Sequence, residues 1–248
     1  MKKQVKAVAA RLLPPSLHFR LYFSYHRLRG GLDAEMLRIG EHLGPRRRFL
    51  DIGANSGYYS FYFQDTFESV DAFEPLSEVT RELESVRKPR VSIHNVALSD
   101  RGGTQTFYLP LDDDGEVVTG LASLEPREGE CSKRDVPIKR LDDYGFTDVD
   151  LIKIDVEGHE LKVLVGAEET IRRTRPHLIV EIEQRHLKTP IAEVFEHIRG
   201  LGYRGIFLLG DRWVDLAEFS LAQHQHPYLD RVWDPRYVNN FVFVPDGR

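Results

Sequence analysis

One stretch of the chain, residues 49–60, constrains its fold more than any other. The stretch begins as a short apolar run, breaks at Asp51 and Gly53, and resumes after Gly57 with aromatic residues at mixed spacing. This order is typical of a β-strand, a tight loop and a helix. Backbone N–H groups at the start of such a helix bind negative or polar ligand groups, and glycine lets a ligand approach the backbone closely. The stretch therefore predicts a ligand-binding loop at the end of a strand.

The residues of this loop separate two classes of ligand. A dinucleotide-binding loop has the pattern G-x-G-x-x-G, whose second glycine lies against the pyrophosphate, whereas Asn55 occupies that position here. The next apolar run, residues 70–73, is followed by Glu74, an acid placed to accept hydrogen bonds from ribose hydroxyls. A glycine loop and a ribose acid without the pyrophosphate glycine favour a nucleoside ligand that lacks phosphates. S-adenosylmethionine is the common ligand of this kind.

The rest of the chain alternates predicted strands and helices, which indicates an α/β protein with a parallel sheet. Residues 205–209 and 240–244 are expected to form a closing, hairpin-like pair of strands. The apolar and turn patterns predict further strands at residues 91–98, 149–154 and 177–182, and helices at residues 77–87, 159–173 and 191–201.

Two segments lie outside this alternation. Apolar residues at helical intervals over residues 16–43 predict two N-terminal helices, so we divide the chain into a helical extension, residues 1–44, and a main domain, residues 45–248. Residues 104–140 interrupt the alternation and predict a β insertion near the mouth of the active site. The acidic run at residues 112–114 is interpreted as a solvated turn rather than a metal site.

Composition narrows the partners and the compartment. The net charge of −5 disfavours nucleic acid as the main partner, and no apolar run reaches the length of a membrane helix. The single cysteine, Cys131, fits a reducing compartment, so we expect a cytoplasmic protein. The basic and partly apolar residues 1–15 could contact an anionic membrane surface peripherally, although a helix packed on the domain is the favoured interpretation.

A second group of polar residues follows the predicted strand at residues 149–154. Asp155 comes directly after that strand, Glu157 and His159 follow it, and Glu181 and Glu183 lie near the end of the next strand. Ligands of open parallel sheets bind outside the carboxyl ends of the strands. These side chains are therefore expected to converge beside the nucleoside site. The alternative is structural, with Asp155 capping the helix and Glu157 paired with an arginine.

Five motifs together resemble the FkbM family of S-adenosylmethionine-dependent methyltransferases, over roughly residues 45–184. The resemblance implies a class I, Rossmann-like fold whose seven-stranded, mostly parallel sheet has helices on both faces. It also implies methyl transfer to a hydroxyl of a sugar, a glycolipid or a polyketide-type secondary metabolite. The motifs lie at residues 51–57, 73–75, 95–99, 141–143 and 152–160.

The same resemblance implies the residues of the cofactor site. The glycine loop would border the methionine moiety, Glu74 would bind the ribose, and residues 95–97 would border the adenine. The implied cofactor-binding residues are Asp51, Gly53, Asn55, Gly57, Glu74, Pro75, Asn95, Val96, Ala97 and Asp155.

An alcohol acceptor must lose a proton or be polarised before it can attack a methyl group, and two mechanisms supply this. In the favoured one, His159 or Glu157 is a general base. In the other, Asp155 and Glu181 hold Mg²⁺, which prefers oxygen ligands. A non-catalytic, regulatory protein that binds S-adenosylmethionine and retains the fold is the alternative to an enzyme. The sequence specifies neither the acceptor nor the oligomeric state.

Overall fold

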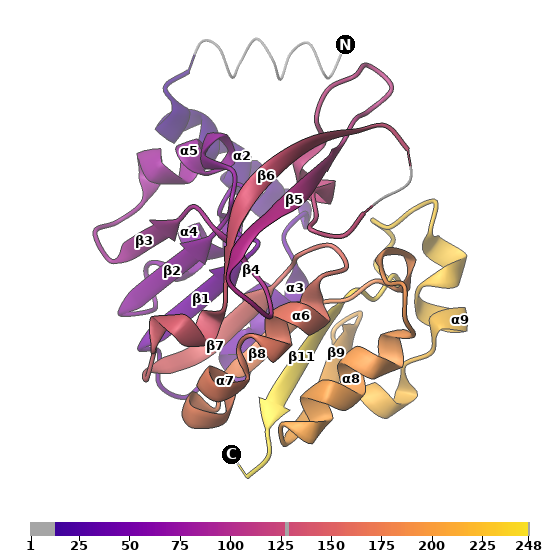
Figure 1. Ribbon diagram of the computed structural model, residues 1–248. Coiled ribbons are helices and arrows are strands. Elements are labelled where there is room, and N and C mark those ends of the chain that lie inside the picture. Colours follow the sequence, from indigo (N-terminus) through magenta and orange to yellow (C-terminus); the bar gives the residue numbers. More distant parts are fainter. Residues whose placement is uncertain (1–12, 127–128, 248) are drawn as a thin grey trace.

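The architecture is that of a mixed α/β protein, as shown by a computed structural model that describes residues 13–126 and 129–247. Within these residues the main sheet has eight strands: β1 (Arg48–Ile52), β2 (Ser69–Phe73), β3 (Val91–His94), β7 (Val149–Ile154), β8 (His177–Glu181), β9 (Tyr203–Leu209), β10 (Arg212–Asp215) and β11 (Asn240–Pro245). Their order across the sheet is β10-β9-β11-β8-β7-β1-β2-β3 (Figure 1). Strands β3, β2, β1, β7 and β8 are parallel neighbours, and β11 runs antiparallel to both β8 and β9.

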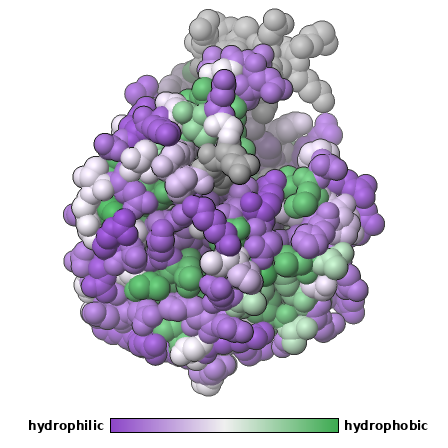
Figure 2. Space-filling model, turned by 45° about the vertical axis from the view of Figure 1, so that its right-hand side comes forward, coloured by the Kyte–Doolittle hydropathy of each residue, from purple (hydrophilic) through white to green (hydrophobic). Residues whose placement is uncertain are grey.

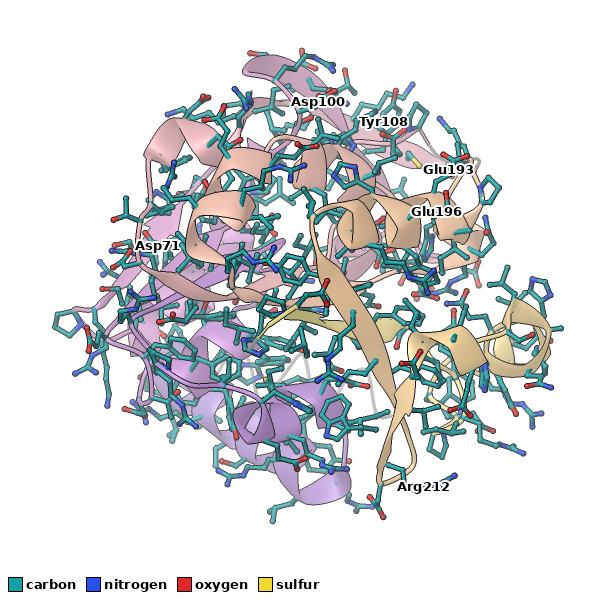
Figure 3. All side chains as sticks on the ribbon, turned by 90° about the horizontal axis from the view of Figure 1, so that it is seen from below. Asp71, Asp100, Tyr108, Glu193, Glu196 and Arg212 are labelled. Carbon is teal, nitrogen blue, oxygen red and sulfur yellow. The ribbon has the colours of Figure 1, made fainter. Side chains whose placement is uncertain are left out.

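Helices cover both faces of this sheet, as predicted. Because both faces are covered, β7 is buried over its whole length and its sequence is nearly continuous in apolar residues. One face carries α2 (Pro15–Arg29), α3 (Ala34–Arg38), α4 (Tyr58–Phe63) and α5 (Ser77–Val86), and the other carries α6 (Glu160–Val165), α7 (Glu168–Thr174) and α8 (Ile191–Gly200). The outer side of α8 is polar, and Glu193 and Glu196 project from it into solvent (Figure 3).

The α/β fold class is confirmed, but the sheet has eight strands among the described residues instead of the predicted seven. The predicted pairing of residues 205–209 with residues 240–244 is correct, since β9 and β11 are antiparallel neighbours. The additional strand, β10, extends the sheet as a hairpin with β9. Trp213 of β10 donates a hydrogen bond of 2.8 Å to Glu41, so a contact with the N-terminal segment holds the added strand in place.

Two predicted elements are divided in the structure. The strand expected at residues 91–98 ends at His94, and Ala97 and Leu98 form β4 (Ala97–Leu98) in a separate sheet. The helix expected at residues 159–173 is interrupted after Gly166, where the backbone passes so close to the Ser99 carbonyl that a Cβ atom would lie 2.0 Å from its oxygen. Contacts between residues distant in sequence therefore interrupt both elements, and the local sequence pattern could not predict these contacts.

The predicted insertion is a second sheet of three strands within the described residues, β4, β5 (Gly103–Pro110) and β6 (Cys131–Lys139), in the order β4-β6-β5 (Figure 1). Its small core joins Phe107, Leu124 and Val136 to Leu76, which precedes α5. The acidic run forms a turn in which the Asp112 carboxylate accepts backbone hydrogen bonds from residues 114 and 116, as predicted.

The two predicted N-terminal helices are α2 and α3, and both pack on the main sheet. Met36 of α3 is 2% exposed and shares a core cluster with Phe49 and Val242 of the sheet. The segment for which membrane contact was expected, residues 1–15, lies largely outside the described residues. The division of the chain at residue 44 stays a prediction. No helix in the described part of the chain is long and apolar enough to cross a membrane.

Candidate active site

The site is built where the carboxyl ends of β1, β2 and β7 meet. The backbone N–H groups of Gly53 and Ala54 both donate to the Phe73 carbonyl at 3.0 Å, which ties the loop after β1 to the end of β2. Gly53 has a φ of +76°, and a Cβ atom there would lie 1.8 Å from the Asp155 carbonyl oxygen. Only glycine therefore allows the loop to approach the end of β7 this closely.

Glu74 at the end of β2 faces the same loop. Its carboxylate accepts hydrogen bonds from the backbone N–H groups of Asn55, at 3.1 Å, and Leu76, at 3.0 Å. Burial raises the pKa of Glu74 to about 7 despite these two bonds. Asn55 adopts the left-handed conformation with a φ of 46°. Strain of this kind is often found at functional sites, where the surrounding structure holds the backbone in place.

A pocket opens between this loop and the insertion. It encloses about 560 Å³ of empty space, a volume that includes space open to solvent. Its walls combine the strand ends with apolar residues of the second sheet. Residues that line it include Gly53, Asn55, Glu74, Pro75, Ala97, Leu98, Phe107, Thr119, Ala122, Leu124, Asp155, Glu157 and His159.

A second pocket adjoins the first and shares Gly53, Asn55 and Asp155 with it. It extends under the segment between α2 and α3. Its lining residues include Gly31, Leu32, Asp33, Met36, Asp51, Gly57, Tyr58, Tyr59 and Lys153. The structure thus brings together eight of the ten predicted cofactor residues around two joined pockets, whereas Asn95 and Val96 line neither.

The positions of Asp51 and Asn95 indicate supporting roles. The Asp51 carboxylate accepts hydrogen bonds from the backbone N–H of Ser60, at 2.9 Å, and from its hydroxyl, at 2.7 Å. Asp51 thereby fixes α4 relative to β1, and its burial raises its pKa to about 6. Asn95 donates to the Glu74 carbonyl at 3.2 Å. This bond fixes the backbone that carries the Glu74 carboxylate.

A half-buried pair of carboxyl groups lies beside the pockets, of which Asp155 lines both and Glu181 lines neither. Asp155 lies at the end of β7 and Glu181 at the end of β8, and burial followed by the negative charge of Glu181 raises the pKa of Asp155 well above its usual range. Burial also raises the pKa of Glu181. Glu181 accepts a further hydrogen bond of 2.8 Å from Asn239. A carboxylate with a raised pKa is a stronger base than an exposed one.

Lys153 supplies the positive charge of this cluster, and the sequence analysis missed it. Its ammonium donates to Asn240 at 2.7 Å, lies 3.5 Å from a Glu181 oxygen and stands 5.2 Å from the centre of the Tyr59 ring. Burial lowers the pKa of the ammonium, but the surrounding carboxylates, Asp155 first, outweigh burial and leave the pKa raised. A lysine within an otherwise apolar, buried strand was the signal that could have identified it.

The structure gives His159 a different environment from the one expected of a free general base. Its Nε2 lies 2.9 Å from the Ser99 hydroxyl and its Nδ1 lies 2.8 Å from a Glu125 oxygen. The ring is 2% exposed, so both nitrogens are engaged within the protein although the residue lines the first pocket. His159 therefore ties the start of α6 to Ser99 after β4 and to Glu125 of the insertion.

Glu157 lies on the tight loop that connects β7 to α6. It adopts a φ of 55°, and its backbone carbonyl accepts a hydrogen bond of 2.8 Å from the Ser123 hydroxyl of the insertion. A Glu157 carboxylate oxygen lies 3.1 Å from Nε2 of His186. The arginine pairing considered from the sequence is thus replaced by a histidine, and the loop is held from two sides.

The donor set does not favour a metal. Among the described residues, no group of three or more His, Cys, Asp or Glu side chains is arranged to hold a metal ion. A Glu181 oxygen instead lies 3.5 Å from the Lys153 ammonium, whose charge also acts on Asp155. The structure therefore gives no support to the magnesium alternative.

A glycine loop after β1, an acid at the end of β2 and a mostly parallel sheet with the antiparallel strand β11 between β8 and β9 define a class I, Rossmann-like methyltransferase fold. Residues 51–204 match the model of the methyltransferase FkbM domain. The chain therefore belongs to the FkbM methyltransferase family.

Individual relatives share parts of the chain. It is 32% identical over 150 residues to the 2-O-methyltransferase NoeI of Sinorhizobium fredii, an alignment that covers 53% of this chain and 61% of NoeI. It is 27% identical over 194 residues to the AMB antimetabolite synthetase AmbE of Pseudomonas aeruginosa, covering 62% of this chain and 9% of AmbE. The chain thus spans less than two thirds of the length of either relative.

A solved structure supports the fold. The chain is similar to the methyltransferase FkbM of Methylobacillus flagellatus KT with a TM-score of 0.52 and 17% sequence identity, over 80% of this chain and 43% of that one. At this identity, the likeness concerns the fold alone.

Proposed function

We propose that this protein is an S-adenosylmethionine-dependent O-methyltransferase that acts on a hydroxyl of a sugar, a glycolipid or a polyketide-type metabolite. The observation that carries the proposal is the cluster of Asp155, Lys153 and Glu181: Asp155 lines both pockets, Lys153 lines the second, and a Glu181 oxygen lies 3.5 Å from the Lys153 ammonium. The relative NoeI is named as a 2-O-methyltransferase, which supports oxygen as the methylated atom.

The residues around the first pocket fit an adenosine. Glu74 offers a carboxylate for ribose hydroxyls, and the apolar side chains of Ala97, Leu98 and Phe107 offer a surface for an adenine. Gly53 lets the loop lie directly against the end of β7, since a Cβ atom there would collide with the Asp155 carbonyl. When bound, S-adenosylmethionine would supply a methyl group on a positively charged sulfur. These residues would hold and orient it, and water would be excluded by the insertion.

The Asp155–Glu181 pair is our candidate for the group that takes the acceptor's proton. Alcohols ionise far above neutral pH, so a nearby base lowers the barrier, typically by 10²–10⁴-fold in rate. Both carboxyls have raised pKa values, and Asp155 lines both pockets. Lys153 stabilises the pair when it loses a proton. We assign His159 to positioning because both of its ring nitrogens are engaged.

The test combines binding and turnover. Calorimetry with S-adenosylmethionine is followed by incubation of the protein and labelled cofactor with fractionated glycans, glycolipids and polyhydroxyl metabolites. We expect binding and label transfer to a hydroxyl, a loss of about 10²–10³-fold in kcat for Glu181→Gln with cofactor affinity retained, and no change for the exposed control Asp211→Asn. Binding without transfer to any fraction would favour the regulatory alternative, and absence of binding would refute the proposal.

The same assay separates the proton acceptors. If His159 or Glu157 is the base, His159→Gln or Glu157→Gln will abolish turnover at saturating substrate while Asp155→Asn retains it. We expect the opposite result, in which Asp155→Asn loses more turnover than His159→Gln or Glu157→Gln. A pH–rate profile whose acidic limb disappears in Asp155→Asn would identify that carboxyl as the titrating group.

A further inference from the structure

Helix α2 is fixed to the protein by one side only. Phe19 and Phe23 are buried, and their rings lie 5.1 Å and 5.0 Å from the ring of Phe61 in edge-to-face contacts. His18 lies 3.1 Å from a Glu82 oxygen of α5. These contacts give the helix a defined orientation, so its opposite side is presented to the surroundings in a fixed way.

That opposite side is a row of large apolar side chains, which we call the α2 stripe. Its members recur at intervals of three or four residues and therefore share one face of the helix. Their exposed fractions are 43% for Leu17, 53% for Leu21, 54% for Tyr25 and 87% for Leu28. Single exposed apolar residues are normal on a protein surface, but four in a row on one helix are not. By contrast, Figure 2 shows a surface on which hydrophobic residues form small areas among hydrophilic ones.

The charge around the α2 stripe is positive. Residues 13–32 contain three arginines and no acidic residue, although the whole chain has 34 basic and 39 acidic residues. On a helical projection, Arg20 and Arg27 lie on one side of the stripe and Arg29 on the other. An apolar row flanked by arginines is typical of helices that lie in the interface of an anionic membrane.

We propose that α2 docks the protein on a bilayer that contains anionic lipids, with the α2 stripe inserted at the level of the headgroups and the arginines bound to their phosphates. The positive charge of the segment favours an anionic membrane as the partner, since each Lys or Arg near an anionic surface contributes attraction. The helix ends at Arg29, and Gly31, Leu32 and Asp33 just beyond it line the second pocket. Docking would therefore place that pocket beside the membrane surface.

Vesicle binding by the full chain tests this proposal. The protein is sedimented with vesicles of phosphatidylcholine alone or with about 30 mol% phosphatidylglycerol. We expect binding to the anionic vesicles only, a decrease of about tenfold or more for Leu17→Ser/Leu21→Ser/Leu28→Ser, and a similar decrease for Arg20→Gln/Arg27→Gln or at high salt. Leu229→Ser, equally exposed at 43%, and Arg199→Gln on α8 are the matched controls.

Folding and self-association are followed on the same samples. Far-UV circular dichroism and S-adenosylmethionine calorimetry should be unchanged in every variant, because none of the altered residues lines a pocket. Equal binding by the wild type and the stripe variant, or no binding to anionic vesicles, would overturn the proposal. If the wild type instead forms a dimer in sedimentation velocity that the stripe variant abolishes, without vesicle binding, the stripe is a contact between copies of the chain.

Discussion

Single residues show that this site is arranged to hold carboxyl groups in a dry environment. Burial raises the pKa of Glu74 to about 7 and that of Asp51 to about 6. Such groups bind protons that they would release in water. Removing these carboxyl groups from water costs free energy. The fold tolerates this cost because the groups lie around pockets where a polar ligand can offer new hydrogen bonds. Raised pKa values are often found at functional sites for this reason.

Glu160 at the start of α6 provides a pH prediction. Burial raises its pKa from 4.5 to about 7, so the folded state keeps a proton that the unfolded chain releases. Its contribution to stability is therefore present below pH 4.5 and is lost as the pH rises to about 7. We expect Glu160→Gln to remove about 3 kcal/mol of the pH dependence of the unfolding free energy between pH 4.5 and 8. Urea titrations of the wild type and the variant at pH 4.5 and pH 8 measure these unfolding free energies.

The control for that experiment is Glu196→Gln on the outer side of α8, which should leave the pH dependence unchanged (Figure 3). Parallel pH curves for Glu160→Gln and the wild type would contradict the assignment.

Gly53 provides a prediction about close approach. Gly53→Ala adds a Cβ atom that would lie 1.8 Å from the Asp155 carbonyl oxygen, whereas Gly145→Ala, at a similar φ of +67°, meets nothing within 4 Å. Both variants pay about 1 kcal/mol for the left-handed backbone. We expect Gly53→Ala to cost about 1–3 kcal/mol more because the ends of β1 and β7 must separate, and to weaken S-adenosylmethionine binding. Urea unfolding and calorimetry measure both effects. Equal stabilities of the two variants would show that the loop can move away at no cost.

At the scale of elements, the insertion is attached to the site by a few polar contacts. The Glu125 carboxylate lies 2.8 Å from Nδ1 of His159 and accepts a hydrogen bond of 2.6 Å from Lys162. The hydrogen bond with His159 is the main reason why the pKa of Glu125 is lowered to about 2. The Ser123 hydroxyl donates to the loop that carries Glu157. The second sheet is therefore held against the β7–α6 loop at the pocket wall.

Glu125→Gln should loosen this attachment. We expect a loss of about 1–2 kcal/mol in unfolding free energy at pH 7, since a hydrogen bond to a charged group is removed, and faster amide hydrogen exchange in β5. Because the pKa of Glu125 is lowered, this difference is present above pH 4.5 and vanishes as the pH falls toward 2. Glu130→Gln, an exposed change in the same insertion, is the control. Unchanged exchange in Glu125→Gln would mean that the apolar core of the second sheet alone holds it.

The sequence predicted the elements whose pattern is local. The loop at Gly53, the acid Glu74 and the carboxyls after β7 were all found from strand ends and glycine spacing, because parallel strands place their carboxyl ends at one edge. It did not predict β10, which pairs with β9 and whose Trp213 also contacts Glu41, distant in sequence. Nor did it predict that Lys153 belongs to the site, because the partners of a charged residue within a strand are known only once the neighbouring strands have been placed.

For the whole molecule, the topology makes the N-terminal segment part of the main structure. Asp33 lines the second pocket and accepts a hydrogen bond of 2.8 Å from Tyr59 of α4. Met36 lies in the core formed by β1 and β11, which come from opposite ends of the chain. A segment that contributes both to the pocket and to the core is expected to unfold together with the sheet.

This cooperativity can be measured with Trp213 as the reporter. The chain has two tryptophans, and Trp233 is 81% exposed, so Trp233→Phe leaves a single tryptophan whose indole contacts the N-terminal segment through Glu41. We expect its fluorescence and the far-UV circular dichroism to change at the same urea concentration. Met36→Ala in that background should cost about 2–5 kcal/mol, as for other buried large-to-small changes, and should shift both transitions equally.

Leu37→Ala, one residue further along and 41% exposed, is the matched control and should cost less than about 0.5 kcal/mol. If Trp213 reports a transition at lower urea than circular dichroism, and Met36→Ala moves only that transition, the N-terminal segment unfolds on its own. The pocket that it lines would then open without unfolding of the sheet, and acceptor access would be controlled by this segment. Coincident transitions instead mean that both pockets keep their shape for as long as the sheet is folded.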